Sequence, residues 1–461
     1  MEGERVEDLD RRYIWHPFTP MRQWLEEEPL VVVEGEGVKL RDSRGRWYYD
    51  GNSSLWVNVH GHRRPEIDAA IREQLGRIAH STALGLASVP ATHLAERLVA
   101  LAPPGLSRVF YSDNGSTAVE IALKIAFQYW TFRGKPEKKI FLKLQNAYHG
   151  DTLGAVSVGG IELFHAAFGP LLFETLTAPS PYCYRCPLDF PPEARPSRGE
   201  AGCGLRCAAE FERLVEENAD RLAAAIVEPV VQAAGGIITM PPGYLRRVWE
   251  ACRRHGVLFI ADEVATGFGR TGKMFACQHE GVAPDLLCVA KGLTGGYLPL
   301  AATLVREEVF QAFLGEEGEF RTFYHGHSYT ANQLGCAAAL ASLDLFQRDR
   351  VLEALPRKAD LVARHLGLLE GFPGVGEVRQ RGLMVGIEVV RERAKKEPFP
   401  PGWRVGYRVC RRARELGLIT RPLGDVVVFM PPLASTEEEL SEMAEILVQA
   451  VKETLGELGA R

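Results

Sequence analysis

The sequence lacks an apolar run long enough to cross a membrane, because its longest candidate, residues 222–238, is interrupted by Glu228, Pro229 and Gln232. It also lacks a basic stripe, since 59 acidic residues are mixed with 54 lysines and arginines and give a net charge of −5. These absences argue against membrane and nucleic-acid partners. Residues 1–12 are acidic and lack the apolar core of a signal peptide, so we expect a cytoplasmic protein.

Cysteine is sparse and unevenly placed, with nine residues in a chain of 461. Five are scattered and are expected to be small core residues in a reducing compartment: Cys252, Cys277, Cys288, Cys336 and Cys410. The other four form two pairs, Cys183-x2-Cys186 and Cys203-x3-Cys207, whose spacing in the Pro-rich stretch 179–204 is typical of zinc ligands. We favour free thiols or a disulfide at this cluster and predict no metal.

The composition, 46% hydrophobic and 25% charged, is that of an ordinary globular protein long enough for more than one domain. From about residue 61 the pattern alternates strand, turn and helix, which is typical of an α/β sheet with helices on its faces. We therefore predict a large domain over residues 61–334. Residues 1–60 and 335–461 are expected to form a smaller α+β domain together.

Five apolar runs in the large domain are predicted to be strands: residues 108–112, 139–145, 223–227, 257–261 and 286–290. Right-handed crossovers would place their carboxyl ends along one edge of a mostly parallel sheet, where such folds bind ligands. In the smaller domain we expect a hairpin from residues 38–40 and 47–49, a helix over 336–346, and strands at 383–390 and 426–430. The last helix should begin with a capping box at Thr436 and Glu439.

The strand over residues 286–290 ends on Lys291, which is followed by glycine. An amine in a partly desolvated cleft has a lowered pKa and becomes a nucleophile able to form a Schiff base. A solvated lysine in a turn is the ordinary alternative. The residues at the ends of the neighbouring strands favour the nucleophile.

Each of those neighbouring residues has a chemical and a structural interpretation. Gly115 and Ser116, between a strand and a helix, would bind a phosphate or merely make a turn. Asp262 would hold a protonated ring nitrogen or be satisfied by a helix N-terminus. Tyr148 would stack on an aromatic ring or lie at an interface, and Asp151 would hold the tyrosine loop, bind a substrate amine or cap a helix. Pyridoxal 5'-phosphate needs a phosphate cradle, a ring face, a carboxylate and an amine, so these residues predict an enzyme using this cofactor.

Residues 262–272 (DEVATGFGRTG), with Lys291 following, strongly resemble the class III (omega-type) aminotransferases. Within this class, three segments resemble the diaminopelargonate aminotransferases of biotin synthesis: residues 15–19 (WHPFT), 147–152 (AYHGDT) and 421–424 (RPLG). The resemblance implies a transaminase that converts 8-amino-7-oxononanoate to 7,8-diaminononanoate. It also implies a fold type I homodimer with small-molecule substrates bound at the subunit interface.

The resemblance assigns roles to individual residues. Lys291 would be the Schiff-base lysine and proton shuttle, Asp262 the partner of the pyridine nitrogen and Tyr148 the stacking ring. The remaining cofactor contacts would come from Gly115, Ser116, Val264 and, across the interface, Ser328. Arg421 would bind the carboxylate of the ketone substrate. The other predicted substrate contacts are Phe18, Trp56, Tyr148, Asp151, Arg270 and Gly326.

The chain departs from the adenosylmethionine-using members of this class at three places. It has Leu55 beside Trp56 where they carry an aromatic pair, and Phe18 and Val428 where they carry tyrosine. These changes thin an aromatic wall suited to adenine and a sulfonium. The predicted amino donor is therefore L-lysine or S-adenosylmethionine, with L-lysine favoured. Two alternatives stay open: an omega-aminotransferase acting on ornithine, 4-aminobutyrate or a diamine, and a non-catalytic cofactor-binding scaffold.

Overall fold

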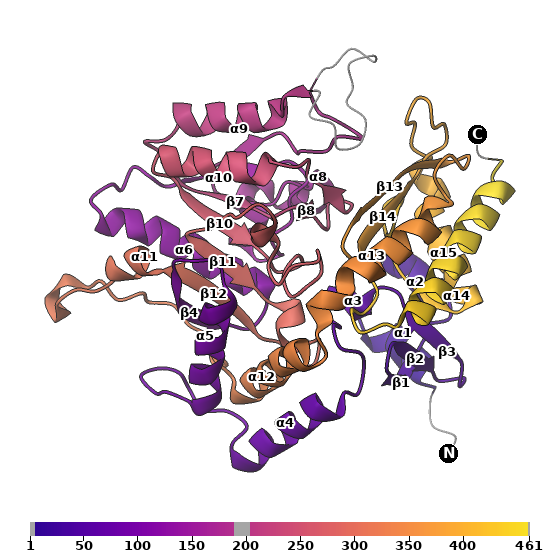
Figure 1. The fold of residues 1–461 in the computed structure, drawn as a ribbon, viewed down its shortest axis with the longest axis horizontal. Coiled ribbons are helices and arrows are strands. Elements are labelled where there is room, and N and C mark those ends of the chain that lie inside the picture. Colours follow the sequence, from indigo (N-terminus) through magenta and orange to yellow (C-terminus); the bar gives the residue numbers. More distant parts are fainter. Residues whose placement is uncertain (1–4, 189–202, 460–461) are drawn as a thin grey trace.

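The computed structural model describes residues 5–188 and 203–459, and its centre is a seven-stranded sheet (Figure 1). The strand order is β4 (Leu106–Ser112), β12 (Ala301–Arg306), β11 (Leu286–Val289), β10 (Leu258–Asp262), β7 (Leu222–Val227), β5 (Ile140–Leu144) and β6 (Thr175–Ala178). β12 runs antiparallel to β11 and β4, and the other neighbouring pairs are parallel. The predicted mostly parallel α/β fold is therefore confirmed.

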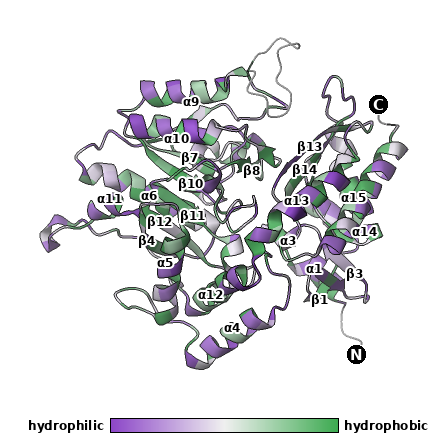
Figure 2. Ribbon diagram, viewed as in Figure 1, coloured by the Kyte–Doolittle hydropathy of each residue, from purple (hydrophilic) through white to green (hydrophobic). Residues whose placement is uncertain are grey.

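Helices cover both faces of this sheet. α6 (Gly115–Phe132) packs on one face, against alternate strand residues such as Ile226, Ile260 and Leu286. The opposite face packs on α5 (Val89–Leu101), α9 (Arg206–Glu217), α10 (Tyr244–Arg254) and α12 (Gln333–Arg348). Burial on both faces produces continuously apolar strands, which Figure 2 shows in green at the centre of the sheet. It also removes the alternation that would have revealed β12, which the sequence analysis missed. The analysis missed the partly exposed edge strand β6 as well.

Two smaller sheets lie beside the large one. The first, β1 (Val32–Glu36), β2 (Lys39–Asp42), β3 (Trp47–Asp50) and β15 (Leu418–Ile419), joins both ends of the chain, because β3 pairs with β15. The second, which we call the C-terminal sheet, has the order β13 (Val375–Arg381), β14 (Met384–Val389), β17 (Val426–Phe429) and β16 (Pro422–Leu423). These pairings confirm the predicted hairpin and the two predicted C-terminal strands. The domain boundaries themselves stay a prediction.

The C-terminal sheet is accompanied by α13 (Val351–Gly367), α14 (Val405–Leu416) and α15 (Glu437–Glu457). α15 begins at the predicted capping box, in which Thr436 and Glu439 exchange hydrogen bonds. The remaining elements are α1 (Val6–Tyr13), α2 (Met21–Glu26), α3 (Ser53–Trp56), α4 (Pro65–Arg77), α7 (Leu153–Ser157), α8 (Glu162–His165), β8 (Val231–Gln232), β9 (Ile238–Thr239), α11 (Glu307–Gln311) and short 3-10 turns.

The nine cysteines are all free thiols in the structure. Cys183, Cys186, Cys203 and Cys207 border one small cavity, where burial raises the pKa of Cys183 to about 11 and that of Cys207 to about 12. Within residues 5–188 and 203–459, no group of three or more potential ligands is arranged to hold a metal ion. Over the same residues, no helix is long and apolar enough to span a bilayer.

Candidate active site

A cavity of about 720 Å³ opens at the carboxyl edge of the seven-stranded sheet. Three parts of the chain form its wall: the strand ends of the large sheet, the N-terminal segment and the edge of the C-terminal sheet. Ten of the predicted site residues line it: Phe18, Trp56, Gly115, Ser116, Tyr148, Asp151, Asp262, Val264, Lys291 and Arg421. Residues separated by hundreds of positions in the sequence thus meet at one site.

Lys291 lies just beyond β11, at the start of a short 3-10 turn. Its φ is +47°, a left-handed conformation that is uncommon outside glycine and is often retained at functional sites. Burial lowers the Lys291 pKa to about 8, although Asp262 and Glu228 oppose the shift. The ammonium nitrogen lies 4.7 Å from the ring centroid of Trp56. A substantial fraction of this amine is therefore neutral near pH 8, as a nucleophile or base requires.

Asp262 ends β10 and is 4% exposed. The sequence analysis expected Asp262 to hold a protonated ring nitrogen or to be satisfied by a helix N-terminus, and the structure places the ring of His149 against it. His149 Nδ1 lies 2.6 Å from Asp262 Oδ2, while the Val264 N–H donates to Oδ1 at 3.0 Å. His149 Nε2 is buried and has no hydrogen-bond partner among the described residues. The imidazole, which also lines the cavity, thus fixes the orientation of the carboxylate.

The turn before α6 has the features of an anion-binding site. Asn114 caps the helix by accepting from the Thr117 N–H, which leaves Gly115 and Ser116 at its first turn beside the cavity. A Cβ on Gly115 would lie 2.5 Å from Val264 Cγ1, so only glycine fits there. Ser116 Oγ lies 2.8 Å from Thr152 Oγ1. A helix N-terminus, small residues and two hydroxyls suit a phosphate group.

Tyr148 and Asp151 are linked within one turn, because the Tyr148 hydroxyl donates to Asp151 Oδ2 at 2.6 Å. Burial and this carboxylate raise the pKa of Tyr148 well above its usual value. The edge of the Tyr148 ring meets Phe164, which in turn contacts Phe18 at a centroid distance of 5.3 Å. Phe164 also lines the cavity and was missed in the sequence, so the aromatic wall is thicker than predicted.

Glu228, like Asp262, is an acidic residue at a strand end that lines the cavity; we call this part of the cavity its floor. In the sequence Glu228 is noted only as the residue that follows an apolar run. It is 3% exposed, and burial together with the nearby Asp262 charge raises its pKa well above the ordinary value. Its Oε2 has no hydrogen-bond partner among the described residues. A protonated carboxyl at this position is a hydrogen-bond donor directed at the cavity region.

Arg421 comes from the segment before β16, is half-buried and lines the cavity. Among the described residues its guanidinium has no hydrogen-bond or ion-pair partner, and burial lowers its pKa. Phe18 and Leu55 also line the cavity, and they are 57% and 47% exposed. An unpaired guanidinium beside apolar walls suits a ligand with an aliphatic chain and a carboxylate.

Three residues that were expected at the substrate end, Arg270, Val428 and Gly326, do not line the cavity, and neither does Ser328, which was expected to act across the interface. Arg270 is buried and does not line the cavity, because its terminal nitrogens donate to the carbonyls of Pro431 and Asn58 at 2.7 Å each. Val428 is buried in β17, outside the cavity wall, so its substitution for tyrosine does not thin that wall. Gly326 and Ser328 are exposed on the segment before α12 and do not line the cavity of their own chain.

Comparison with known proteins identifies the family. The family model described as "Aminotransferase class-III" matches residues 21–451, so the chain belongs to the class III aminotransferases. It is 54% identical over 458 residues to an "Adenosylmethionine-8-amino-7-oxononanoate aminotransferase" of Geobacter sulfurreducens, covering 99% of each chain.

Two solved structures are also similar. The first is adenosylmethionine-8-amino-7-oxononanoate aminotransferase from Methanocaldococcus jannaschii, with a TM-score of 0.91, 45% identity, and 97% of this chain and 98% of that chain covered. The second is an omega transaminase from Pseudomonas jessenii in complex with PMP, with a TM-score of 0.93, 31% identity and 99% of each chain covered. The resemblance to class III aminotransferases stated from the sequence is thus confirmed.

Proposed function

We propose that this aminotransferase uses pyridoxal 5'-phosphate to aminate 8-amino-7-oxononanoate to 7,8-diaminononanoate, the step of biotin synthesis predicted from the sequence. The observation that carries the proposal is the Arg421 guanidinium, which lines the same cavity as Lys291 and has no hydrogen-bond or ion-pair partner among the described residues. The relatives named for this substrate support it, at 54% identity over nearly the full chain.

The cavity floor fits the cofactor. Gly115 and Ser116, with Thr152 behind them, would hold the phosphate, and Val264 and Tyr148 would lie on the two ring faces. Asp262 would hold a proton on the ring nitrogen, and Lys291 would meet the aldehyde. When bound, pyridoxal phosphate supplies an aldehyde that exchanges amines and a ring that withdraws electrons. The similar transaminase solved with PMP supports the same assignment.

The protein's own groups divide the work of proton transfer. Lys291, whose pKa is about 8, would remove a proton from the substrate carbon and later give a proton back. This proton transfer is general acid–base catalysis. Asp262, which accepts from the Val264 N–H and lies 2.6 Å from His149 Nδ1, would hold the proton on the ring nitrogen of the cofactor. Over a full cycle the donor loses its amino group and becomes a carbonyl compound, while the ketone of the acceptor becomes an amine.

The remaining residues of the cavity wall match the chemical groups of the acceptor. 8-Amino-7-oxononanoate carries a carboxylate, an aliphatic chain, a ketone and an ammonium group. Arg421 would bind the carboxylate, Phe18 and Trp56 would border the chain, and Asp151 would receive the ammonium. Arg270 is left out of this assignment because its nitrogens already bind backbone carbonyls.

For the amino donor we propose S-adenosylmethionine, against the preference for lysine drawn from the sequence. Two of the three residues behind that preference, Leu55 and Phe18, line the cavity. The third, Val428, lies outside its wall, and Phe164 adds an aromatic ring to that wall. The relatives' names also specify adenosylmethionine. Sulfonium and adenine groups both gain from contact with aromatic faces.

We further propose a cytoplasmic homodimer in which the second chain completes the site. Large apolar side chains remain exposed on this protomer, including Leu84, Val89 and Tyr324. Such exposed groups favour an interface. Ser328 and Gly326, exposed and outside their own cavity, would then serve the cavity of the partner. Free cysteines suit a reducing compartment.

The decisive experiment is turnover of 8-amino-7-oxononanoate by the purified holoenzyme with S-adenosylmethionine or lysine, with diaminononanoate measured by mass spectrometry. Arg421→Met should raise KM for this acceptor by about 10–150-fold, the equivalent of a charge-assisted hydrogen bond of roughly 1.5–3 kcal/mol. The methyl ester of the acceptor is the control, since it lacks the carboxylate and should respond little to Arg421→Met. Absence of turnover with any donor, in an enzyme that transaminates other amines, would assign it to another omega-aminotransferase activity.

A further inference from the structure

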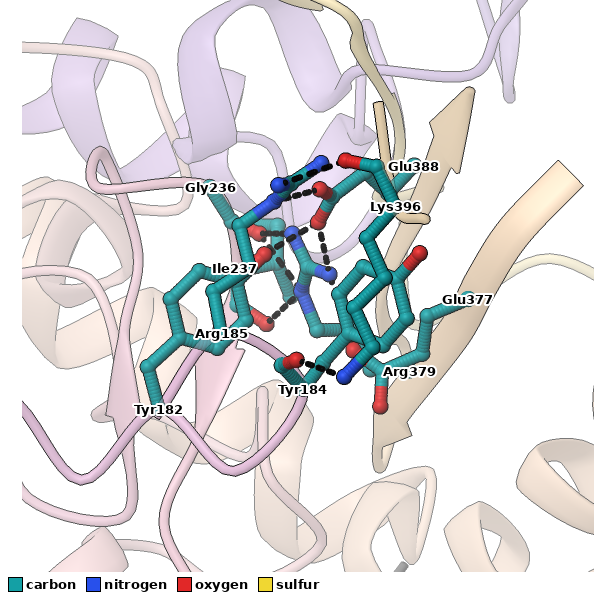
Figure 3. Close-up of polar contacts among 9 residues, drawn as sticks. All are labelled: Tyr182, Tyr184, Arg185, Gly236, Ile237, Glu377, Arg379, Glu388 and Lys396. Carbon is teal, nitrogen blue, oxygen red and sulfur yellow. Dashed lines mark hydrogen bonds and ion pairs between the residues drawn. The ribbon is translucent and has the colours of Figure 1, made fainter. Parts of the chain in front are cut away.

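A buried ion cluster outside the cavity connects the C-terminal sheet to two segments of the large-sheet region (Figure 3). Its centre is Arg379 on β13, which is 2% exposed, and Glu388 on the neighbouring strand β14. Tyr182 and Arg185, both from the segment that follows β6, donate to the carboxylate of Glu388. The cluster therefore joins elements that are distant in sequence.

Arg379 connects two carboxylates to two backbone carbonyls. Its Nη1 lies 2.6 Å from Glu388 Oε2 and 2.9 Å from Glu377 Oε2. Its Nε and Nη2 donate to the Gly236 carbonyl at 2.9 and 2.7 Å, and Nε also donates to the Ile237 carbonyl at 3.1 Å. Gly236 and Ile237 belong to the turn between β8 and β9, residues 233–237, which we call the β8–β9 turn. The guanidinium thus joins this turn to the C-terminal sheet.

The β8–β9 turn is a strained segment. Ile237 has φ of +54°, and Val230, just before β8, has φ of +69°. β-Branched residues rarely adopt this left-handed conformation, and they keep it only where surrounding contacts hold them. A Cβ on Gly386 of β14 would lie 3.0 Å from Ile237 Cβ, so the sheet also presses closely on the turn. Arg379 donates charged hydrogen bonds to the Gly236 and Ile237 carbonyls and so helps to hold this strained backbone.

The same turn forms part of the cavity wall. Ala233 and Ala234 line the cavity, and the Ala233 carbonyl accepts from the N–H groups of Gly236 and Ile237 at 3.1 and 2.8 Å. Glu228, which precedes the hairpin, lines the cavity too. One hydrogen-bonded turn therefore has the Arg379 guanidinium on one side and the substrate cavity on the other.

We propose that Arg379 is a positioning residue that holds the β8–β9 turn and thereby sets the shape of the Ala233–Ala234 wall and the affinity for substrate. It acts through the turn, because its guanidinium binds the two carboxylates and the two carbonyls, packs on the Tyr182 ring and does not line the cavity. Lys291 and Asp262 stand on the large sheet and keep their places without it. This inference deepens the proposed function and rests on it for the choice of acceptor.

The competing explanation is that Arg379 only neutralises Glu388 and so contributes to stability. Arg185 provides a matched control. Its Nε lies 2.5 Å from Glu388 Oε1, and its other hydrogen bond goes to the Lys396 carbonyl, outside the β8–β9 turn. Arg379→Met and Arg185→Met each remove one cation from Glu388, but only Arg379→Met releases the turn.

The test measures KM, kcat, thermal midpoint and the visible spectrum of the holoenzyme for both variants. Arg379→Met should raise the KM for the acceptor by about tenfold or more, with kcat per bound cofactor within about threefold and the spectrum unchanged. Arg185→Met should lower the thermal midpoint and leave KM within about twofold. Arg379→Lys, which retains a donor but not the planar fork, should give an intermediate KM.

If Arg379→Met does not fold, Gly386→Ala tests the same turn, because the added Cβ would lie 3.0 Å from Ile237 Cβ and 3.1 Å from the Gly236 carbonyl oxygen that Arg379 binds. It should raise KM by about three- to tenfold. Equal KM values in wild type, Arg379→Met (or Gly386→Ala) and Arg185→Met would overturn the proposal. Should wild type fail with 8-amino-7-oxononanoate, the proposed acceptor is wrong, and the variants are compared on pyruvate with a simple amine instead.

Discussion

The two ends of the cavity are built in different ways. At the floor, Lys291, Asp262 and Gly115 follow strands of one sheet, and their neighbours hold them through short hydrogen bonds and close packing. At the rim, Phe18 and Leu55 lie in the N-terminal segment and are about half exposed. We therefore expect the large sheet to position the groups that carry out the reaction. We expect the N-terminal segment to select among substrates. Changes at the floor should act on every substrate, and changes at the rim should act on particular ones.

The largest effect is expected from removing the amine at the floor. Lys291→Ala should reduce transamination on the order of 10⁴–10⁶-fold, the size seen when enzymes lose a nucleophile. The variant should still bind pyridoxal phosphate non-covalently, because the Gly115–Ser116 cradle and Asp262 remain. Turnover and retention of the cofactor after dialysis are the two measurements.

Lys143→Met is the matched control for this prediction. Lys143 is also half-buried, with a pKa lowered by burial, but it donates to the carbonyls of Ser157 and Gly159 away from the cavity. It should keep activity within a few-fold. Substantial turnover by Lys291→Ala without added amine would remove the assignment of the nucleophile.

A smaller but still general effect is expected at the second floor residue. Asp262→Asn should lower kcat by at least about a hundredfold for every amine, because a neutral amide loses the charge that stabilises the developing transition state. Asp285→Asn is the control, since Asp285 is another acid of the same sheet and accepts from the Phe259 N–H at 2.8 Å. Wild-type kinetics in Asp262→Asn would make that residue a structural acid.

The floor was largely predictable from the sequence, and the reason is geometric. A strand that ends abruptly on a lysine or aspartate reveals a residue at the sheet edge, and parallel strands gather such ends together. His149 stood in the same turn as Tyr148 but received no role, because its partner Asp262 lies 113 positions away. No local pattern signals a contact over that separation.

The rim was harder to predict for a different reason. Arg270 sits eight residues after Asp262 in a motif typical of the family, yet its guanidinium turns to the carbonyls of Asn58 and Pro431. Phe164 carries no motif and reaches the cavity only because α8 folds back over Tyr148. Side-chain direction in loops depends on tertiary packing, so spacing alone leaves it undetermined.

The smallest predicted effect sharpens the comparison at the rim. Leu55→Trp should raise kcat/KM for S-adenosylmethionine relative to lysine by about two- to tenfold, because one added base-stacking contact is worth about 1–3 kcal/mol when complete and less at a half-exposed position. Leu55 has a φ of −132°, which tryptophan adopts without strain. Competition between the two donors, with 8-amino-7-oxononanoate as common acceptor, measures the ratio directly. Leu368→Trp, at an exposed apolar residue outside the cavity, controls for a nonspecific effect of the ring. If both donors gained equally, position 55 would contribute general apolar contact, and donor choice would have to reside in the Phe18, Phe164 and Tyr148 wall.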